Sequence, residues 1–285
     1  MAHALAQLWA CSAALLVAPF ALAGCRAPPE ERATLRARAE TTIAAAPEYS
    51  KPPPASAPSG ETRLPPLRAE WLVALGGERE GVVAPAVGAT AARPIVVGVH
   101  GAGDRPEWSC GGWRLASQAN MFVVCPRGAA MTKDTFAWSS SAQLAERVES
   151  AVARTGELFG AYVAPTPLIY AGFSQGATLA EPFLREHAAR FPIAILAEGG
   201  YQISSSPAFA RAFRAAGGRR LVLVCGSAAC FQRARLSKTV LERAGLEVLV
   251  VGDPLAGHNL NERMQRALQS AWSEIAAPLR SVPPP

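Results

Sequence analysis

Lysine is scarce in this 285-residue sequence, which contains only Lys51, Lys133 and Lys238. The formal net charge of +6 therefore comes from arginines, and these are scattered along the chain rather than gathered in one segment. Proteins that bind nucleic acids concentrate basic residues on one surface, so the sequence argues against a nucleic-acid partner. The chain also lacks internal repeats, and 50% of its residues are hydrophobic, which is enough for a sizeable core.

Long hydrophobic runs are missing too, apart from one that covers residues 5–22. Pro19 interrupts this run, which is too short for a comfortable membrane span and suits a cleavable export signal. It ends in Leu-Ala-Gly-Cys at residues 22–25, which resembles the lipobox of bacterial lipoproteins. The resemblance implies a signal peptide at residues 1–24 and a lipid on Cys25 that anchors the protein to the cell envelope, facing the periplasm or the cell surface. The alternative is an ordinary secretory signal that is cut nearby.

No two cysteines have the CxxC spacing that is typical of structural zinc sites, so we expect no metal. Cys11 would leave with the signal peptide and Cys25 would carry the lipid, which leaves four cysteines in the mature chain. In an oxidising compartment these four can pair in three ways. The simplest pairing joins sequence neighbours, namely Cys110 with Cys125 and Cys225 with Cys230.

The residues that follow the lipobox have the composition of a linker. Residues 25–66 are rich in Ala, Pro, Arg and Glu and show no hydrophobic periodicity. We interpret them as a lipidated cysteine followed by a disordered tether. The folded domain is expected at residues 67–280, with an unstructured tail at 281–285.

Within the expected domain, short apolar segments alternate with helical patterns. Segments that are hydrophobic throughout indicate strands buried on both faces, as in a parallel sheet. The predicted strands cover residues 95–99, 122–125, 168–172, 193–197, 221–225 and 247–251, with 71–75 and 81–83 as antiparallel edge strands. We therefore predict a single α/β domain with a doubly wound, mostly parallel sheet.

Helices are predicted between these strands. From residue 141 onward, Leu144, Val148 and Val152 recur every four residues and form one apolar stripe. A second helix is expected to begin at Gln175 and to bend at Pro182, and others cover 207–216, 231–244 and 259–275. Segments 105–113 and 127–140 are expected as loops. Their aromatic residues either line an apolar cleft or pack beneath it; they are Trp108, Trp113, Phe136 and Trp138.

The sequence Gly-Phe-Ser-Gln-Gly at residues 172–176 stands between a predicted strand and a predicted helix. In that context GxSxG indicates a nucleophile elbow, a strained turn that exposes a serine hydroxyl at the carboxyl end of a sheet and the start of a helix. The alternative is an ordinary strand-to-helix turn. On the first interpretation Ser174 is the candidate nucleophile.

A serine hydroxyl needs a base, and the expected domain contains only three histidines, His100, His187 and His258. His187 lies among charged residues of a predicted helix and is interpreted as a solvated surface residue. His258 follows the last predicted strand, so a loop can bring its imidazole to the elbow. We therefore take His258 as the candidate base, with a loop or helix-capping role as the alternative.

His100 opens a turn of small residues, His-Gly-Ala-Gly-Asp at 100–104, directly after a predicted strand. Such a turn lets backbone amides approach a ligand. We predict an oxyanion hole made by the amides of Ala102 and of Gln175, the residue after the candidate nucleophile. A plain glycine turn is the alternative.

Together these segments resemble the phospholipase/carboxylesterase branch of the α/β-hydrolase superfamily, which includes acyl-protein thioesterases, and also polyhydroxybutyrate-depolymerase-like esterases. The resemblance covers about residues 93–268 and rests on HGAGD at 100–104, CPRG at 125–128, Trp138, GFSQG at 172–176 and GH at 257–258. It implies the α/β-hydrolase fold and hydrolysis of a small-molecule or lipid ester, or of a thioester, through an acyl-enzyme and without a cofactor.

The orienting acid is missing from the position where this branch usually has it. Such enzymes carry an aspartate a few residues after the strand that corresponds to 221–225, but residues 226–236 contain no carboxylate. Glu198, directly after the predicted strand 193–197, is the preferred substitute. Asp253, five residues before His258, is the alternative, and a catalytic dyad or an impaired enzyme are the remaining interpretations.

Three functions are compatible with these residues. The favoured one is a serine esterase or thioesterase at the cell envelope. The second is a catalytically impaired lipoprotein that kept the fold as a binding module, which the missing aspartate suggests. A peptidase ranks last, because the sequence shows no propeller and no sizeable cap insertion.

Overall fold

The computed structural model describes residues 63–77 and 80–281 of the chain. The predicted signal peptide, Cys25 and residues 25–62 of the predicted tether lie outside the described residues, as do residues 282–285 of the predicted tail. In the part of the chain that is described, no helix combines the length and the hydrophobicity needed to cross a membrane.

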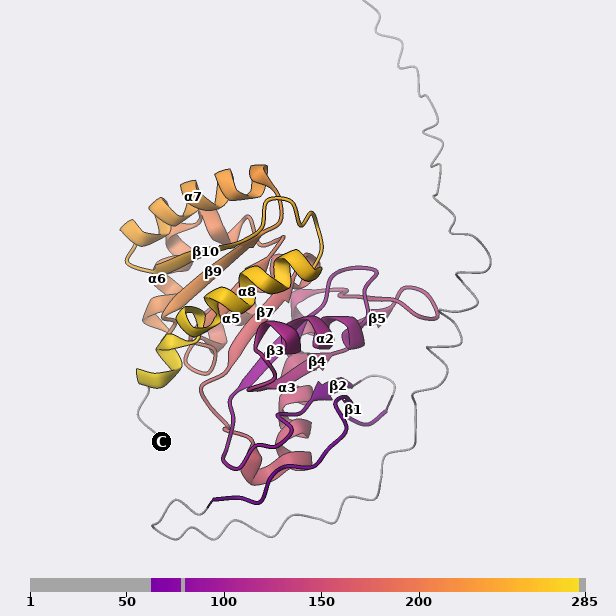
Figure 1. The fold of residues 1–285 in the computed structure, drawn as a ribbon. Coiled ribbons are helices and arrows are strands. Elements are labelled where there is room, and N and C mark those ends of the chain that lie inside the picture. The colour runs from indigo at the N-terminus through magenta and orange to yellow at the C-terminus, as the bar shows by residue number, and fades with distance from the viewer. Residues whose placement is uncertain (1–62, 78–79, 282–285) are drawn as a thin grey trace, which may run out of the picture. The chain divides into compact units, whose positions relative to one another are not determined.

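Eight strands form one sheet in the order β1-β2-β4-β3-β7-β8-β9-β10 (Figure 1). The strands predicted as parallel are β3 (Ile95–Val99), β4 (Phe122–Pro126), β7 (Ile169–Phe173), β8 (Ile193–Ala197), β9 (Arg220–Cys225) and β10 (Glu247–Gly252). They do pair in parallel, whereas β1 (Val73–Ala74) and β2 (Gly81–Ala84) join antiparallel at one edge. The predicted doubly wound, mostly parallel sheet is confirmed.

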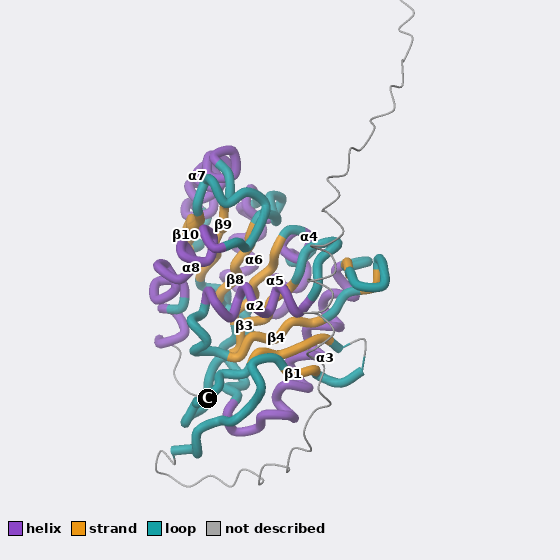
Figure 2. Tube along the Cα trace, turned by 45° about the vertical axis from the view of Figure 1, so that its right-hand side comes forward, coloured by secondary structure: helices purple, strands orange, loops and turns teal. Residues whose placement is uncertain are grey.

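Both faces of the sheet are covered by helices, which explains why the parallel strands contain continuous apolar segments. In β3, Ile95 and Val97 contribute to one hydrophobic cluster and Val96 to the cluster on the opposite face. The first cluster also contains residues of α3 (Ser141–Phe159), α5 (Glu181–His187), α6 (Pro207–Ala215) and α7 (Ala228–Arg243). The second contains residues of α2 (Pro106–Ala116) and α8 (Glu262–Ile275). Figure 2 shows the orange strands running between these purple helices.

The helix predicted to start at Gln175 differs from the expectation. It is divided into α4 (Gln175–Thr178) and α5, so that Pro182 stands in the first turn of a new helix instead of bending a longer one. The reason is that proline has no N–H to donate inside a helix, whereas a first-turn position requires none. The division gives the chain a very short helix directly after Ser174.

The segment 105–113, expected as a loop, is helical in the structure and forms most of α2. Pro106 stands at its start, and Cys110, Trp113 and Ala116 form its buried face at helical spacing. The segment 127–140 does hold a loop, tightened by the short pair β5 (Ala129–Ala130) and β6 (Phe136–Ala137). Single 3₁₀ turns complete the described chain at Gly160–Tyr162, Ile203–Ser205 and Ala277–Ser281.

The aromatic residues of these two segments divide between the two roles considered for them. Trp113 and Trp138 are buried and pack beneath the surface, whereas Trp108 is 62% exposed. Phe136 is partly buried, with the guanidinium of Arg127 lying 4.8 Å from its ring centroid. Trp108 is therefore the most exposed of the four side chains.

Two disulfides join the sequence neighbours that we expected to pair. Cys110 in α2 is linked to Cys125 in β4, and Cys225 at the end of β9 is linked to Cys230 in the first turn of α7. All four residues are buried. Disulfides persist in oxidising compartments, so this pairing is compatible with an exported protein.

Candidate active site

Ser174 lies in a sharp turn between β7 and α4, with φ of 50° and ψ of −109°. A positive φ is strained for a residue with a side chain and marks a position that the surrounding structure must enforce. The flanking glycines are part of that enforcement: a Cβ on Gly172 would lie 2.7 Å from the Ala177 nitrogen, and one on Gly176 would lie 2.5 Å from the Val99 oxygen. The turn therefore has the geometry of a nucleophile elbow.

The elbow is fixed from below by two buried hydrogen bonds. The Ser174 N–H donates to the Ala197 carbonyl at 2.8 Å, and the Tyr170 hydroxyl donates to the Gly176 carbonyl at 2.6 Å. Burial raises the pKa of the Tyr170 hydroxyl, so this group stays a neutral donor. The side chain of Ser174 is left to face the carboxyl ends of the strands.

His258 approaches Ser174 from the loop that follows β10. Its Nε2 lies 2.9 Å from the Ser174 Oγ, and its ring packs against Phe173 with 5.1 Å between ring centroids. The imidazole side chain is 57% exposed, so a substrate can reach it from solvent. The loop is held close to its tip, where the Gly257 N–H donates to the Gly226 carbonyl at 2.8 Å.

The other ring nitrogen of His258 faces Glu198. The Nδ1 lies 3.3 Å from the Oε2 of Glu198, whose Oε1 accepts a hydrogen bond of 2.5 Å from the Gly226 N–H. Glu198 follows β8, is buried, and has a positive φ of 52°. A carboxylate in this position favours the tautomer that carries its proton on Nδ1, which leaves Nε2 free to accept the serine proton.

The alternative acid, Asp253, is engaged elsewhere. Its Oδ1 accepts a hydrogen bond of 2.8 Å from the Leu255 N–H, and its Oδ2 lies 3.4 Å from the Arg263 guanidinium. It thus stabilises the turn after β10. Of the two candidate acids, the structure brings Glu198 to the imidazole.

His100 holds the glycine-rich turn beside the elbow. It is buried, its Nδ1 donates to the Gly101 carbonyl at 2.7 Å, and its Nε2 accepts from the Gly128 N–H at 3.1 Å. Burial, the largest effect, lowers the pKa of this imidazole. The neutral ring is the form in which Nε2 can accept, so the hydrogen bond from the Gly128 N–H depends on His100 staying uncharged.

The glycine-rich turn lies directly against the elbow, since a Cβ added to Gly101 would be 3.2 Å from the Cβ of Ser174. Ala102 is exposed in this turn. Gln175 is the first residue of α4, and the first N–H groups of a helix have no acceptor within it. These positions are compatible with the predicted oxyanion hole.

The side chain of Gln175 connects the elbow to the 127–140 segment through Trp138, a contact that the sequence did not predict. Its Oε1 accepts from the Trp138 N–H at 2.9 Å and its Nε2 donates to the Trp138 carbonyl at 3.0 Å. The Trp138 indole in turn donates to the His100 carbonyl at 2.9 Å and stacks on its ring at 4.7 Å. A chain of contacts thus links the elbow to the glycine-rich turn.

His187, predicted as a solvated surface residue, is partly buried. Its ring stacks on Phe183 with 4.5 Å between ring centroids, and its Nδ1 lies 3.6 Å from a carboxylate oxygen of Glu149. The charged sequence around it suggested full solvation, whereas Phe183 supplies an apolar surface one helical turn away. These contacts give His187 a packing role in α5.

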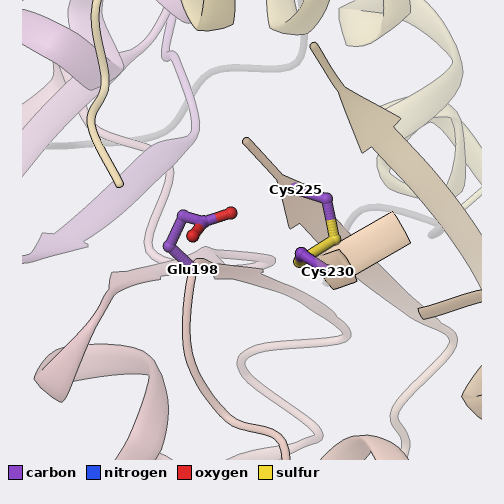
Figure 3. A group of neighbouring side chains, drawn as sticks. All are labelled: Glu198, Cys225 and Cys230. Carbon is purple, nitrogen blue, oxygen red and sulfur yellow. A yellow bond between two sulfur atoms is a disulfide. The ribbon is translucent and has the colours of Figure 1, made fainter. Parts of the chain in front are cut away.

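Glu198 also lies against a disulfide (Figure 3). One of its carboxylate oxygens and the sulfurs of Cys225 and Cys230 lie within 4.8 Å of one another. Such a trio could resemble a set of metal ligands, but both sulfurs are bonded to each other and are not thiolates. The disulfide instead forms part of the wall behind the carboxylate.

Comparison with known proteins identifies the fold. No family model matches the sequence, and no curated protein sequence matches it significantly. Among solved structures, an uncharacterized protein from Bacillus cereus aligns with a TM-score of 0.53 and 16% identity over 65% of this chain. The present chain spans 60% of the length of that protein.

Two enzyme structures align less well. A carboxylesterase from Mesorhizobium loti gives a TM-score of 0.45 at 17% identity, covering 64% of this chain and 89% of that one. Acyl-protein thioesterase 2 from Zea mays gives 0.38 at 17% identity, covering 65% and 95%. At such TM-scores these two similarities carry no further conclusion. The order of the eight strands, with an antiparallel pair at one edge and parallel pairing elsewhere, is the observation that gives this chain the α/β-hydrolase fold.

Proposed function

We propose that this protein is a serine hydrolase that cleaves carboxylic esters or thioesters through an acyl-enzyme. The observation that carries the proposal is the distance of 2.9 Å between the Ser174 Oγ and the His258 Nε2, with the buried carboxylate of Glu198 at the opposite side of the ring. Nucleophile, base and orienting acid within such reach of one another are what acyl transfer requires.

The first half of the reaction forms the acyl-enzyme. The Ser174 oxygen attacks the acyl carbon while His258 takes the hydroxyl proton on Nε2. The amides of Ala102 and Gln175 stabilise the negative charge that develops on the carbonyl oxygen. When the tetrahedral intermediate collapses, the bond to the leaving group breaks, and His258 returns the proton to the departing alcohol or thiol.

The second half releases the acid. A water molecule takes the place of the leaving group, gives its proton to His258 and attacks the acyl carbon. Collapse of the second tetrahedral intermediate breaks the bond to Ser174, and His258 returns the proton to the Ser174 oxygen, which restores its hydroxyl. The open position of His258, which is 57% exposed, suits entry of that water.

Labelling with a fluorophosphonate tests this proposal. The protein should react covalently, and mass spectrometry should locate the adduct on Ser174. The Ser174→Ala variant should be unlabelled and should hydrolyse p-nitrophenyl acetate or a short thioester at least a thousandfold more slowly. Equal turnover by the parent and the variant, with no adduct on the parent, would exclude a serine mechanism.

The proposal includes an envelope location, with a lipid on Cys25 as the anchor. The sequence at residues 22–25 and the two disulfides support it. Cells fed with radiolabelled palmitate should label the parent protein but not the Cys25→Ser variant, which should move to the soluble fraction. Equal labelling of both would contradict lipidation at this residue.

The alternative, a catalytically impaired binding module, arose from the missing aspartate after β9. The contact between Glu198 and His258 weakens the argument for an impaired enzyme, because a carboxylate reaches the imidazole from the end of β8. Ligand binding that Ser174→Ala leaves unchanged, with no turnover across a broad panel of esters, would favour the alternative.

A further inference from the structure

The turn after β9 is the common support of both partners of Ser174. The Val224 carbonyl accepts from the Glu198 N–H at 3.0 Å, and the Gly226 N–H donates to the Glu198 carboxylate at 2.5 Å. The Gly226 carbonyl accepts from the Gly257 N–H, next to His258, at 2.8 Å. Val224 therefore holds the backbone of Glu198. Gly226 holds both the Glu198 carboxylate and the loop that carries His258.

The same turn touches the loop that carries His258 at two points, where β10 ends and directly before His258. A Cβ on Gly252, where β10 ends, would lie 2.0 Å from the Cys225 oxygen. A Cβ on Gly226 would lie 1.9 Å from the Gly257 oxygen. The backbone of the turn is thus packed so closely against the backbone of the loop that neither glycine can carry a side chain.

The disulfide between Cys225 and Cys230 determines where this turn can lie. It joins the last residue of β9 to the first turn of α7, with a Cα–Cα distance of 5.4 Å and a sequence separation of 5. Ser227, inside the closed loop, caps α7 by accepting from the Cys230 N–H at 3.2 Å. The small loop thus has its ends covalently joined and its start hydrogen-bonded to the helix.

The lengths of the loops that the two disulfides close distinguish positioning of the site from general stabilisation of the fold. In the chain-entropy account, a disulfide that closes a longer loop restricts the unfolded chain more. The pair Cys110 and Cys125 closes a loop of separation 15, three times that of Cys225 and Cys230. If the two bonds served stability alone, removal of the longer one should be the more harmful to the protein.

We propose that the disulfide between Cys225 and Cys230 is a positioning device for the proposed active site, which holds the Glu198 carboxylate and the His258 loop in register with Ser174. The inference rests on the proposed function. It assigns the two cysteines no contact with the substrate, since they act through Val224, Gly226 and Gly252.

The test compares two alanine pairs, Cys225→Ala with Cys230→Ala and, as the matched control, Cys110→Ala with Cys125→Ala. Alanine suits the first site, which is walled by the apolar side chains of Leu196, Leu223 and Ala234. The first pair should lower kcat for a p-nitrophenyl ester by about tenfold with little change in KM, because only the alignment of the reacting groups is lost. The control pair should lower the melting temperature but leave kcat within about twofold.

A double-mutant cycle with Glu198→Gln shows whether the disulfide acts through the acid. Groups that act as one unit give effects that are not additive. The alanine pair should therefore cost little further kcat in the Glu198→Gln background. Equal losses in both backgrounds, an unchanged kcat, or a fall in kcat that the control pair reproduces would each overturn the proposal.

Two further measurements keep the inference separate from folding defects and from the proposed function. Dithiothreitol can reduce a disulfide of the folded parent to two cysteine thiols, and the reagent becomes its cyclic disulfide. Mass spectrometry then identifies which disulfide was opened. Opening of the Cys225 bond should reproduce the loss in kcat. Independently of turnover, the NMR signals of the His258 ring should change in the alanine pair and not in the control. Unchanged signals count against the positioning role, whereas retention of activity in Ser174→Ala counts against the proposed function.

Discussion

The carboxylate of Glu198 lies 3.3 Å from the Nδ1 of His258, although Glu198 follows β8 and β9 lies between that strand and β10. The side chain of glutamate is one methylene longer than that of aspartate. That length allows a residue after β8 to reach an imidazole that arrives from β10. The residues at the end of β9 are thereby left to build a support for the acid and the base.

Replacing Glu198 with Gln should lower kcat for an ester by about a hundredfold or more with KM little changed, because the amide no longer selects the imidazole tautomer or balances its positive charge. Asp253→Asn is the matched control, since Asp253 contacts Leu255 and Arg263 instead. It should stay within about threefold of the parent. Steady-state kinetics on one ester compares the two, and a larger loss in Asp253→Asn would reverse the assignment of the acid.

Gly226→Ala should impair both activity and stability. Its Cβ would lie 1.9 Å from the Gly257 oxygen, so the loop that carries His258 must move. We expect kcat to fall at least about tenfold, in line with the cost of misplacing a reacting group by an ångström. Gly156→Ala in α3 is the control, because a Cβ there meets nothing within 4 Å and should stabilise the helix by about 0.5–1 kcal/mol. Kinetics and urea unfolding test both, and an unaltered Gly226→Ala enzyme would contradict the proposed support.

Gln175→Ala should reduce activity although the backbone amide of residue 175 remains. The lost side chain makes two hydrogen bonds to the Trp138 backbone, and Trp138 contacts the carbonyl of His100. Without this connection the two proposed oxyanion donors are no longer held at a fixed separation. We expect kcat about tenfold lower, a fraction of the cost of losing a donor outright. Gln143→Ala, which removes a contact with the neighbouring Ser139 N–H, should leave kcat unchanged; similar losses in both variants would indicate a general loosening of the loop.

The buried His100 predicts loss of stability in mild acid. Burial lowers its pKa below the ordinary value of 6.5, against smaller opposing effects of the Gly101 hydrogen bond, Asp104 and Glu107. As the pH falls below about 6.5, His100 becomes protonated in the unfolded chain but stays neutral in the folded protein. The free energy of unfolding therefore decreases until the pH passes the lower pKa of the folded state. The stabilisation that comes from keeping His100 neutral is fully present above about pH 6.5.

His100→Gln keeps a donor and an acceptor at this position but cannot titrate. Between about pH 6.5 and 5 its free energy of unfolding should fall less steeply than that of the parent, by up to about 1.4 kcal/mol per pH unit. Urea unfolding across pH 5–8 measures the difference, because the other titrating groups are common to both proteins. Parallel curves would mean that His100 is already protonated in the fold or titrates normally.

Much of the sheet could be predicted from the sequence, because each parallel strand contains a continuous apolar segment and is followed by a helical pattern. The turn at Ser174 could also be predicted from the GxSxG pattern, since only glycine tolerates the close approaches at residues 172 and 176. The segment of α2 was missed because its two consecutive glycines, Gly111 and Gly112, and the preceding Pro106 are read as turn signals. Its burial against β4 and β2 compensates for their weak helix propensity.

The sequence favoured Glu198 over Asp253 but could not exclude Asp253. Both stand shortly after a predicted strand, and their distances to the imidazole depend on strand order and on how the loop after β10 folds back. The roles of Gly226 and of the Gln175 side chain were hidden for the same reason. A glycine after a strand and the fourth residue of a GxSxG sequence are ordinary until the partner that each meets is known.

The order in which the chain is made gives the position of His258 a further consequence. It follows Ser174 by 84 residues and is held by a loop that closes only once β9 and β10 have joined the sheet. A nascent chain that ends before residue 258 contains Ser174, the proposed nucleophile, without its proposed proton acceptor. On the function proposed above, ester cleavage requires the loop after β10 to hold His258 beside Ser174, so activity depends on completion of the last strand of the sheet.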